Sequence, residues 1–114
     1  MTRVRFFERD GLLCGMEARG HSGYAQEGND IVCAAVSAVM AVTESYLTDM
    51  CGYDTAVSMD PDEPRITVRL KSGTDEQRQN CHKILRAAKA TLEENAQEYS
   101  SWLRVSVVSE KFGN

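Results

Sequence analysis

The sequence lacks several features that would assign the protein to a class at once. None of the four cysteines forms a CxxC pair, because Cys14, Cys33, Cys51 and Cys81 lie 19, 18 and 30 positions apart. Zinc-ribbon spacing is therefore absent. No segment approaches the roughly 18 consecutive apolar residues of a membrane-spanning helix, and the first five residues lack the apolar stretch of a signal peptide. We expect a cytoplasmic protein with free thiols and no membrane partner.

An excess of positive charge is also missing. The chain has 13 lysine and arginine residues against 17 aspartate and glutamate residues, so its formal net charge is -4. A nucleic-acid binder usually carries a basic stripe, because neutralising phosphates drives its affinity. Here basic and acidic residues alternate along the chain, so we expect no direct nucleic-acid partner.

The length of 114 residues predicts a single domain, residues 1–114, and the composition is that of a soluble globular protein. The Asp10-Gly11 step is a strong turn signal and predicts a β-hairpin over residues 2–18. Residues 54–60 and 65–70 are predicted strands joined by a turn. A last strand is expected from Trp102 to Val108.

Two helices are predicted between these strands. The first follows Asp30, a predicted N-cap, and ends near Gly52. It is apolar nearly all round, which predicts burial on most sides. The second, over about 75–97, has one apolar stripe and one charged face. The order β-β-α-β-β-α-β predicts an α+β fold, with a mostly antiparallel sheet covered by two helices.

The segment that suggests chemistry runs from a glycine-rich loop into the first helix. Residues 19–29 carry Gly20, Gly23 and Gly28, which predicts a loop that can open and admit substrate backbone. His21 lies in this loop, and Cys33 lies in the first helical turn. A helix N-terminus favours the thiolate, and a nearby imidazole can accept the thiol proton. Amides at the helix start are candidate donors for an oxyanion.

Each of these residues also has a structural interpretation. Cys33 sits in an apolar run, where cysteine is usually an inert small hydrophobe, and His21 is by default a solvated loop residue. Asp30 is more readily a helix cap than a third catalytic residue. Ser37 follows Cys33 by one turn and is given no chemical role.

The remaining cysteines and histidine supply weaker alternatives. Cys81 falls on the predicted buried stripe of the second helix with His82 beside it, so core packing explains both. A zinc site built from His21, Cys33, Cys81 and His82 stays open, although no spacing favours it. A redox-sensing thiol is less favoured, because Cys33 has no evident resolving cysteine nearby.

The segment from Gly20-His21-Ser22-Gly23 to Asp30-Ile31-Val32-Cys33-Ala34-Ala35-Val36-Ser37 resembles the signature of the ribosomal-processing cysteine proteases, the Prp family. That pattern is Gly-His, eleven intervening residues, and a cysteine within Asp-Ile-Val-Cys-Ala-x-Val-Ser. Every element stands here at the matching position, although Ser22 replaces a common alanine. Outside residues 20–38 the similarity rests on length, the opening hairpin and element order.

The resemblance implies a cysteine protease that removes a short N-terminal extension from one large-subunit ribosomal protein, the twenty-seventh in the usual numbering. It implies a homodimer. We expect no cofactor and no metal. His21 and Cys33 carry over as the catalytic residues, whereas Gly20, Asp30 and Ser37 carry over as supporting positions. The alternative from another class is a non-enzymatic ribosome-assembly protein that uses the loop to bind a partner and keeps Cys33 in its core.

Overall fold

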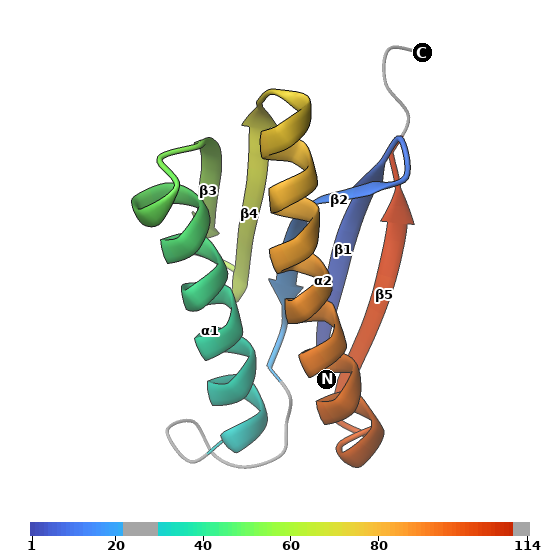
Figure 1. Ribbon diagram of the computed structural model, residues 1–114. Helices are drawn as coiled ribbons and strands as arrows, with labels where there is room; N and C mark the ends of the chain where they lie inside the picture. The colour runs from blue at the N-terminus through green and yellow to red at the C-terminus, as the bar shows by residue number, and fades with distance from the viewer. Residues whose placement is uncertain (22–29, 111–114) are drawn as a thin grey trace.

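The computed structural model describes residues 1–21 and 30–110, which form one sheet and two long helices (Figure 1). The predicted order of strands and helices is confirmed, with a short π-helix, η1, added after the first helix. The elements are β1 (Thr2–Arg9), β2 (Leu12–Arg19), α1 (Ile31–Glu44), η1 (Ser45–Met50), β3 (Asp54–Asp60), β4 (Arg65–Ser72), α2 (Asp75–Glu98) and β5 (Leu103–Ser109). Gly23 and Gly28 lie outside the described residues.

The five strands form a mixed sheet in the order β3-β4-β2-β1-β5. The pairings β3–β4, β4–β2 and β2–β1 are antiparallel, whereas β5 runs parallel to β1. The sheet is thus mostly antiparallel as predicted, with one parallel edge. The β1–β2 hairpin turns at Asp10 and Gly11, which both adopt positive φ (52° and 80°), as a tight Asp-Gly turn requires.

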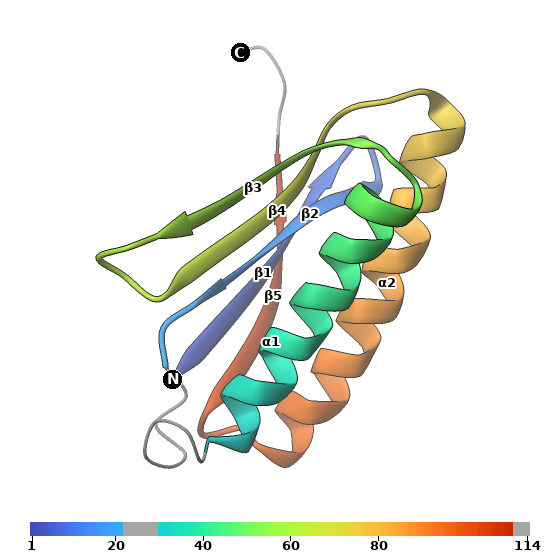
Figure 2. The same cartoon turned by 90° about the vertical axis from the view of Figure 1, so that its left-hand side faces the viewer.

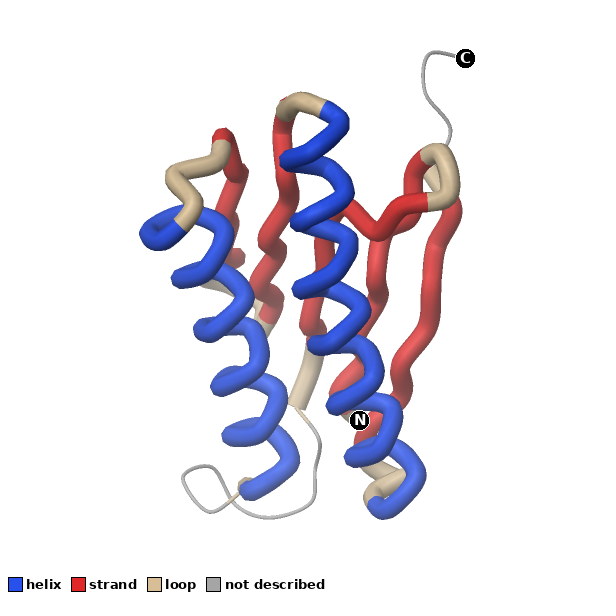
Figure 3. The backbone as a smooth tube through the Cα atoms, viewed as in Figure 1, coloured by secondary structure: helices blue, strands red, loops and turns tan. Residues whose placement is uncertain are grey.

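Both helices cover the same face of the sheet (Figure 2). Each helix connects two strands that point the same way, β2 to β3 through α1 and β4 to β5 through α2. The two crossovers move in opposite directions along the sheet and start from oppositely directed strands. Because such crossovers are almost always right-handed, both helices must fall on one side. Figure 3 shows them lying next to each other across the strands.

The core lies between the sheet and these helices. It is formed by inward residues of β1, β2 and β4, by Val32, Val36 and Met40 of α1, and by Cys81, Leu85 and Leu92 of α2. The predicted apolar stripe of α2 is therefore confirmed. The helix-free face of the sheet carries charged pairs such as Arg5–Glu17, whose nitrogen and oxygen lie 2.9 Å apart.

The prediction that the first helix is buried on most sides is wrong for this chain. Only one face of α1 packs on the core, and Ile31 and Val42 are 51% and 63% exposed. The stretch Ile31–Met50 is long and apolar enough to span a membrane by composition, a property shared with core helices of soluble proteins. In this fold the stretch lies on the sheet and beside α2, and its outward side chains are not covered by other described residues.

Candidate active site

Cys33 lies in the first turn of α1, where the sequence predicted it. The carboxylate of Asp30 accepts hydrogen bonds from the amides of Val32 and Cys33, both at 3.0 Å, so the predicted N-cap is confirmed. The cap holds the helix start and thereby the direction of the Cys33 side chain. The thiol is partly exposed rather than sealed in the core.

The structure brings Cys33 and His21 to the same cavity. This cavity of about 310 Å³ is lined by both residues, with Gly20 beside His21 and Ser37 one helical turn after Cys33. His21 is exposed, at the end of the chain segment that leaves β2. An imidazole and a thiol that share a solvent-accessible cavity at a helix N-terminus have the components of nucleophilic catalysis.

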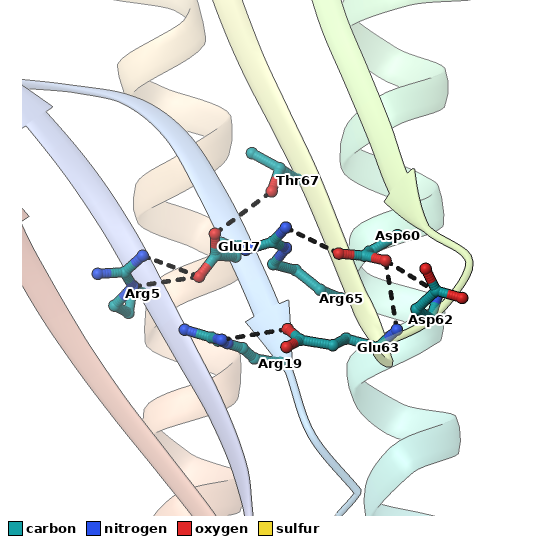
Figure 4. A network of polar contacts seen from close by, with 8 residues as sticks. All are labelled: Arg5, Glu17, Arg19, Asp60, Asp62, Glu63, Arg65 and Thr67. Carbon is teal, nitrogen blue, oxygen red and sulfur yellow. Dashed lines mark hydrogen bonds and ion pairs between the residues drawn. The ribbon is translucent and has the colours of Figure 1, made fainter.

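The opposite wall of the cavity is formed by the turn between β3 and β4, which sequence reasoning did not place at the site. Met59, Asp60, Glu63, Pro64, Arg65 and Ile66 line it. Ion pairs fix this turn, with Arg19 bonding Glu63 at 3.2 Å and Arg65 bonding Asp60 at 2.9 Å (Figure 4). Hydrogen bonds from the amides of Asp62 and Glu63, with the Arg65 charge beside them, lower the pKa of Asp60. These contacts link the β3–β4 turn to Arg19 of β2 and connect its own residues to one another.

Gly20 connects that wall to the chain segment that carries His21. Its amide donates to the carbonyl of Pro64 at 2.8 Å, and its φ is +84°, a value that favours glycine. A Cβ at this position would lie 2.8 Å from the carbonyl oxygen of Met1. Glycine is therefore required by backbone geometry directly before His21.

Thr2 is a second site residue that sequence reasoning missed. This first residue of β1 is 2% exposed, and its hydroxyl oxygen lies 3.7 Å from the sulfur of Cys33. The same hydroxyl donates to the carbonyl of Gly20 at 3.4 Å. Nothing in a single threonine near the N-terminus signals this contact, because it depends on where the sheet places the helix start.

The backbone amides expected to stabilise an oxyanion already donate hydrogen bonds within the helix start. The amides of Val32 and Cys33 donate to the side chain of Asp30, and the amide of Ala34 donates to its carbonyl at 3.1 Å. The carboxylate of Asp30 also offsets part of the positive end of the helix. The helix start therefore orients Cys33 without presenting these three amides to a substrate.

The other cysteines and His82 have structural surroundings. Cys81 is fully buried, and desolvation raises its pKa to about 12. The Nδ1 of His82 accepts a hydrogen bond from the amide of Leu13 at 2.9 Å. Among the described residues no group of three or more histidine, cysteine or acidic side chains is arranged to hold a metal. The open zinc alternative thus gains no support from the described geometry.

A larger cavity, about 510 Å³, lies at the other end of the sheet beside the β1–β2 turn and the start of α2. Cys14 lines it, and burial raises the pKa of this thiol. A protonated thiol is a poor nucleophile. Neither histidine lines this larger cavity, whereas His21 and Cys33 both line the smaller one, which is therefore the candidate active site.

Comparisons with known proteins support the fold described above. A family model described as cysteine protease Prp matches residues 1–104. The ribosomal processing cysteine protease Prp of Bacillus subtilis (strain 168) is 26% identical over 104 residues, which cover 90% of this chain and 92% of the relative.

Two crystal structures share the fold. SMU.848 from Streptococcus mutans superposes with a TM-score of 0.81 at 23% identity, covering 96% of each chain. An essential ribosomal processing protease from S. aureus, in complex with a covalently linked product peptide, has a TM-score of 0.81 at 22% identity. That match covers 95% of this chain and 100% of the other, and these likenesses confirm the α+β fold.

Proposed function

Because the chain belongs to the cysteine protease Prp family, we propose that it removes a short N-terminal extension from a ribosomal protein precursor, the twenty-seventh protein of the large subunit. Cys33 is the nucleophile and His21 its base. The observation that carries this proposal is the shared cavity, which is lined by the exposed His21 and the partly exposed Cys33. The Bacillus subtilis relative is a ribosomal processing protease, which supports the substrate class.

The proposed reaction begins with transfer of the Cys33 thiol proton to the imidazole of His21. The thiolate attacks the scissile carbonyl and forms a tetrahedral intermediate, whose collapse leaves a thioester on Cys33. His21 gives its proton to the departing amine of the mature ribosomal protein. Water, deprotonated by His21, then hydrolyses the thioester and releases the extension as a carboxylate. The positive end of α1 favours the negative charge on sulfur.

The wall formed by the ends of β3 and β4 and the turn between them gives the substrate a surface to lie against. Pro64 and Ile66 supply apolar contact, whereas the side chains of Asp60 and Glu63 are already bonded to arginines. An extended peptide placed between this wall and the start of α1 presents its carbonyls to Cys33.

The direct test is intact mass of the precursor after incubation with this protein. We expect loss of a short N-terminal peptide with the unchanged chain and with Cys51→Ala, a matched cysteine control outside the cavity. Cys33→Ala and His21→Ala are expected to lower turnover at least about 10²-fold while remaining folded. No cleavage by the unchanged chain, with the folded precursor bound, would favour the assembly-protein alternative.

We also propose that the protein is a cytoplasmic homodimer joined through the uncovered face of α1. The four free thiols suit a reducing compartment. An apolar groove of about 260 Å³ runs between α1 and α2, lined by residues such as Val39, Val42 and Ile84. Exposed apolar faces of this kind are typical of subunit interfaces.

Sedimentation of the chain and of Val42→Asp tests the dimer. We expect a dimer mass for the former and a monomer mass for the latter, because a charge at 63% exposed Val42 is harmless in a monomer but costly in an apolar interface. Thr91→Asp, which places a charge at an exposed polar position lining the same groove, is the control and should weaken the dimer less than Val42→Asp. A concentration-independent monomer for the unchanged chain would contradict the proposal.

A further inference from the structure

Thr2 stands out among the buried polar side chains of the described residues. Three such residues are buried: Thr2, Glu17 and Thr43. Glu17 pairs with Arg5, and the hydroxyl of Thr43 donates to the carbonyl of Val39 within its own helix at 2.8 Å. The hydroxyl of Thr2 instead faces two groups of the active site, the carbonyl of Gly20 and the sulfur of Cys33. Packing alone does not require a hydroxyl there, because valine has the same shape.

The backbone of Thr2 is held firmly enough to aim this hydroxyl. Its amide donates to the carbonyl of Trp102 at 2.9 Å, and the residue pairs with Leu103 of β5. The next residue, Arg3, pairs with Arg19 of β2. Val4, two residues on, is fully buried in the core. The hydroxyl therefore reaches Cys33 from the rigid sheet, whereas His21 reaches the cavity from the loop that follows β2.

A threonine hydroxyl has one hydrogen to donate and can accept others. While Cys33 is a thiol, the Thr2 hydrogen points to the Gly20 carbonyl and the oxygen can accept the S–H. Once the thiol proton has moved to His21, the sulfur is an anion without a hydrogen. The Thr2 hydrogen then gains by turning to the sulfur, because hydrogen bonds to charged acceptors are about twice as strong as neutral ones.

We infer that Thr2 is a positioning residue that stabilises the Cys33 thiolate by switching its hydroxyl hydrogen from the Gly20 carbonyl to the sulfur. The switch breaks one long hydrogen bond and forms one charge-assisted bond. The hydrogen stays on the Thr2 oxygen throughout, and the thiol proton stays on His21. This role rests on the proposed function of Cys33 as nucleophile.

The test is the pH dependence of Cys33 alkylation by iodoacetamide, followed on the Cys33 peptide by mass spectrometry. Thr2→Val keeps the side-chain shape and removes the hydroxyl, so we expect the alkylation midpoint to move up by about one pH unit. Thr2→Ser keeps the hydroxyl and should retain the original midpoint. Thr43→Val removes a buried hydroxyl away from the site and should also leave it unchanged.

Equal midpoints for the unchanged chain and Thr2→Val would overturn the inference, as would an equal shift in Thr2→Ser. Should Thr2→Val fail to fold, Thr2→Ala against Thr2→Ser isolates the hydroxyl, and equal midpoints in that pair would overturn it too. The readout does not depend on turnover. A Cys33→Ala variant that still cleaves the precursor would refute the proposed nucleophile without altering the alkylation result for Thr2.

Discussion

His21 and Cys33 stand twelve positions apart in the sequence and line one cavity in the fold. Both were predicted from the sequence, because a glycine-flanked histidine before a capped helix start is a local pattern. Thr2 and the wall around Pro64 were not found. Strand pairing and the hydrogen bond from the Gly20 amide to the Pro64 carbonyl bring these residues to the cavity. The residues joined in this way are far apart in the sequence, so no local sequence pattern predicts their contact.

The four cysteines are predicted to differ in reactivity, with Cys33 the fastest and Cys81 the slowest. Cys81 has a pKa of about 12, so about one part in ten thousand is thiolate at pH 8, and burial also raises the pKa of Cys14. We expect Cys33 to be alkylated first in the folded protein and Cys81 only after unfolding. Peptide-resolved labelling at pH 8, with and without denaturant, measures this order.

A Cys81 that labels as fast as Cys33 in the folded protein would contradict the buried environment assigned to it. Thermal unfolding measured on the same sample serves as the control, because partial unfolding would expose every thiol. Labelling that rises together at all four positions would indicate opening of the whole domain rather than reactivity of one site.

At the scale of elements, the hairpin, the two helices and the strand order along the chain were predictable from turn signals, caps and periodicity. The parallel pairing of β5 with β1 was not, because it depends on where the α2 crossover returns the chain. The exposed outer face of α1 also escaped prediction. An all-round apolar helix indicates burial, but the sequence of one chain does not say which surface provides the cover.

The two helix caps offer a matched pair of substitutions. Asp30→Ala removes the cap of α1 beside the active site, whereas Thr74→Ala removes the capping box of α2 at the other end of the molecule. Each is expected to lower the free energy of unfolding by about 1 kcal/mol. Denaturant unfolding measures this loss.

Turnover should separate the two variants. Asp30→Ala alters the turn that aims Cys33, so its rate of cleavage should change, whereas Thr74→Ala should cleave at the original rate. Asp30→Asn keeps a side-chain acceptor for the amides of Val32 and Cys33, and should retain most of the stability. Equal turnover in Asp30→Ala and Thr74→Ala would show that the α1 cap does not position the nucleophile.

At the scale of the whole molecule, Glu110, directly after β5, ties this edge strand to β4, which lies beyond β1 and β2 in the sheet. Its two carboxylate oxygens accept hydrogen bonds from Arg69 at 2.7 and 2.9 Å, and Arg69 lies 3.8 Å from the ring centroid of Phe7. The hydrogen bonds from Arg69 lower the pKa of Glu110 from its ordinary value of 4.5. The carboxylate therefore stabilises the fold above that value, and this stabilisation is lost as the pH falls through the lowered pKa.

Glu110→Gln is expected to lower the free energy of unfolding by about 1 kcal/mol at pH 7. The difference from the unchanged chain should persist down to about pH 5 and shrink below pH 4.5. Glu63→Gln, which removes a pair with both side chains about half exposed, should cost less than about 0.5 kcal/mol. A Glu110→Gln loss that stays constant to pH 3 would rule out the ion pair as its origin.

The central claim is that Cys33 itself attacks the substrate, and an acid-quenched single-turnover reaction tests it most directly. The thioester adds the mass of the released extension, less one water, to the peptide that carries Cys33. We predict this adduct on that peptide at early times, followed by its decay as product forms. The adduct on Cys14, Cys51 or Cys81, or full product formation by Cys33→Ala, would contradict the account.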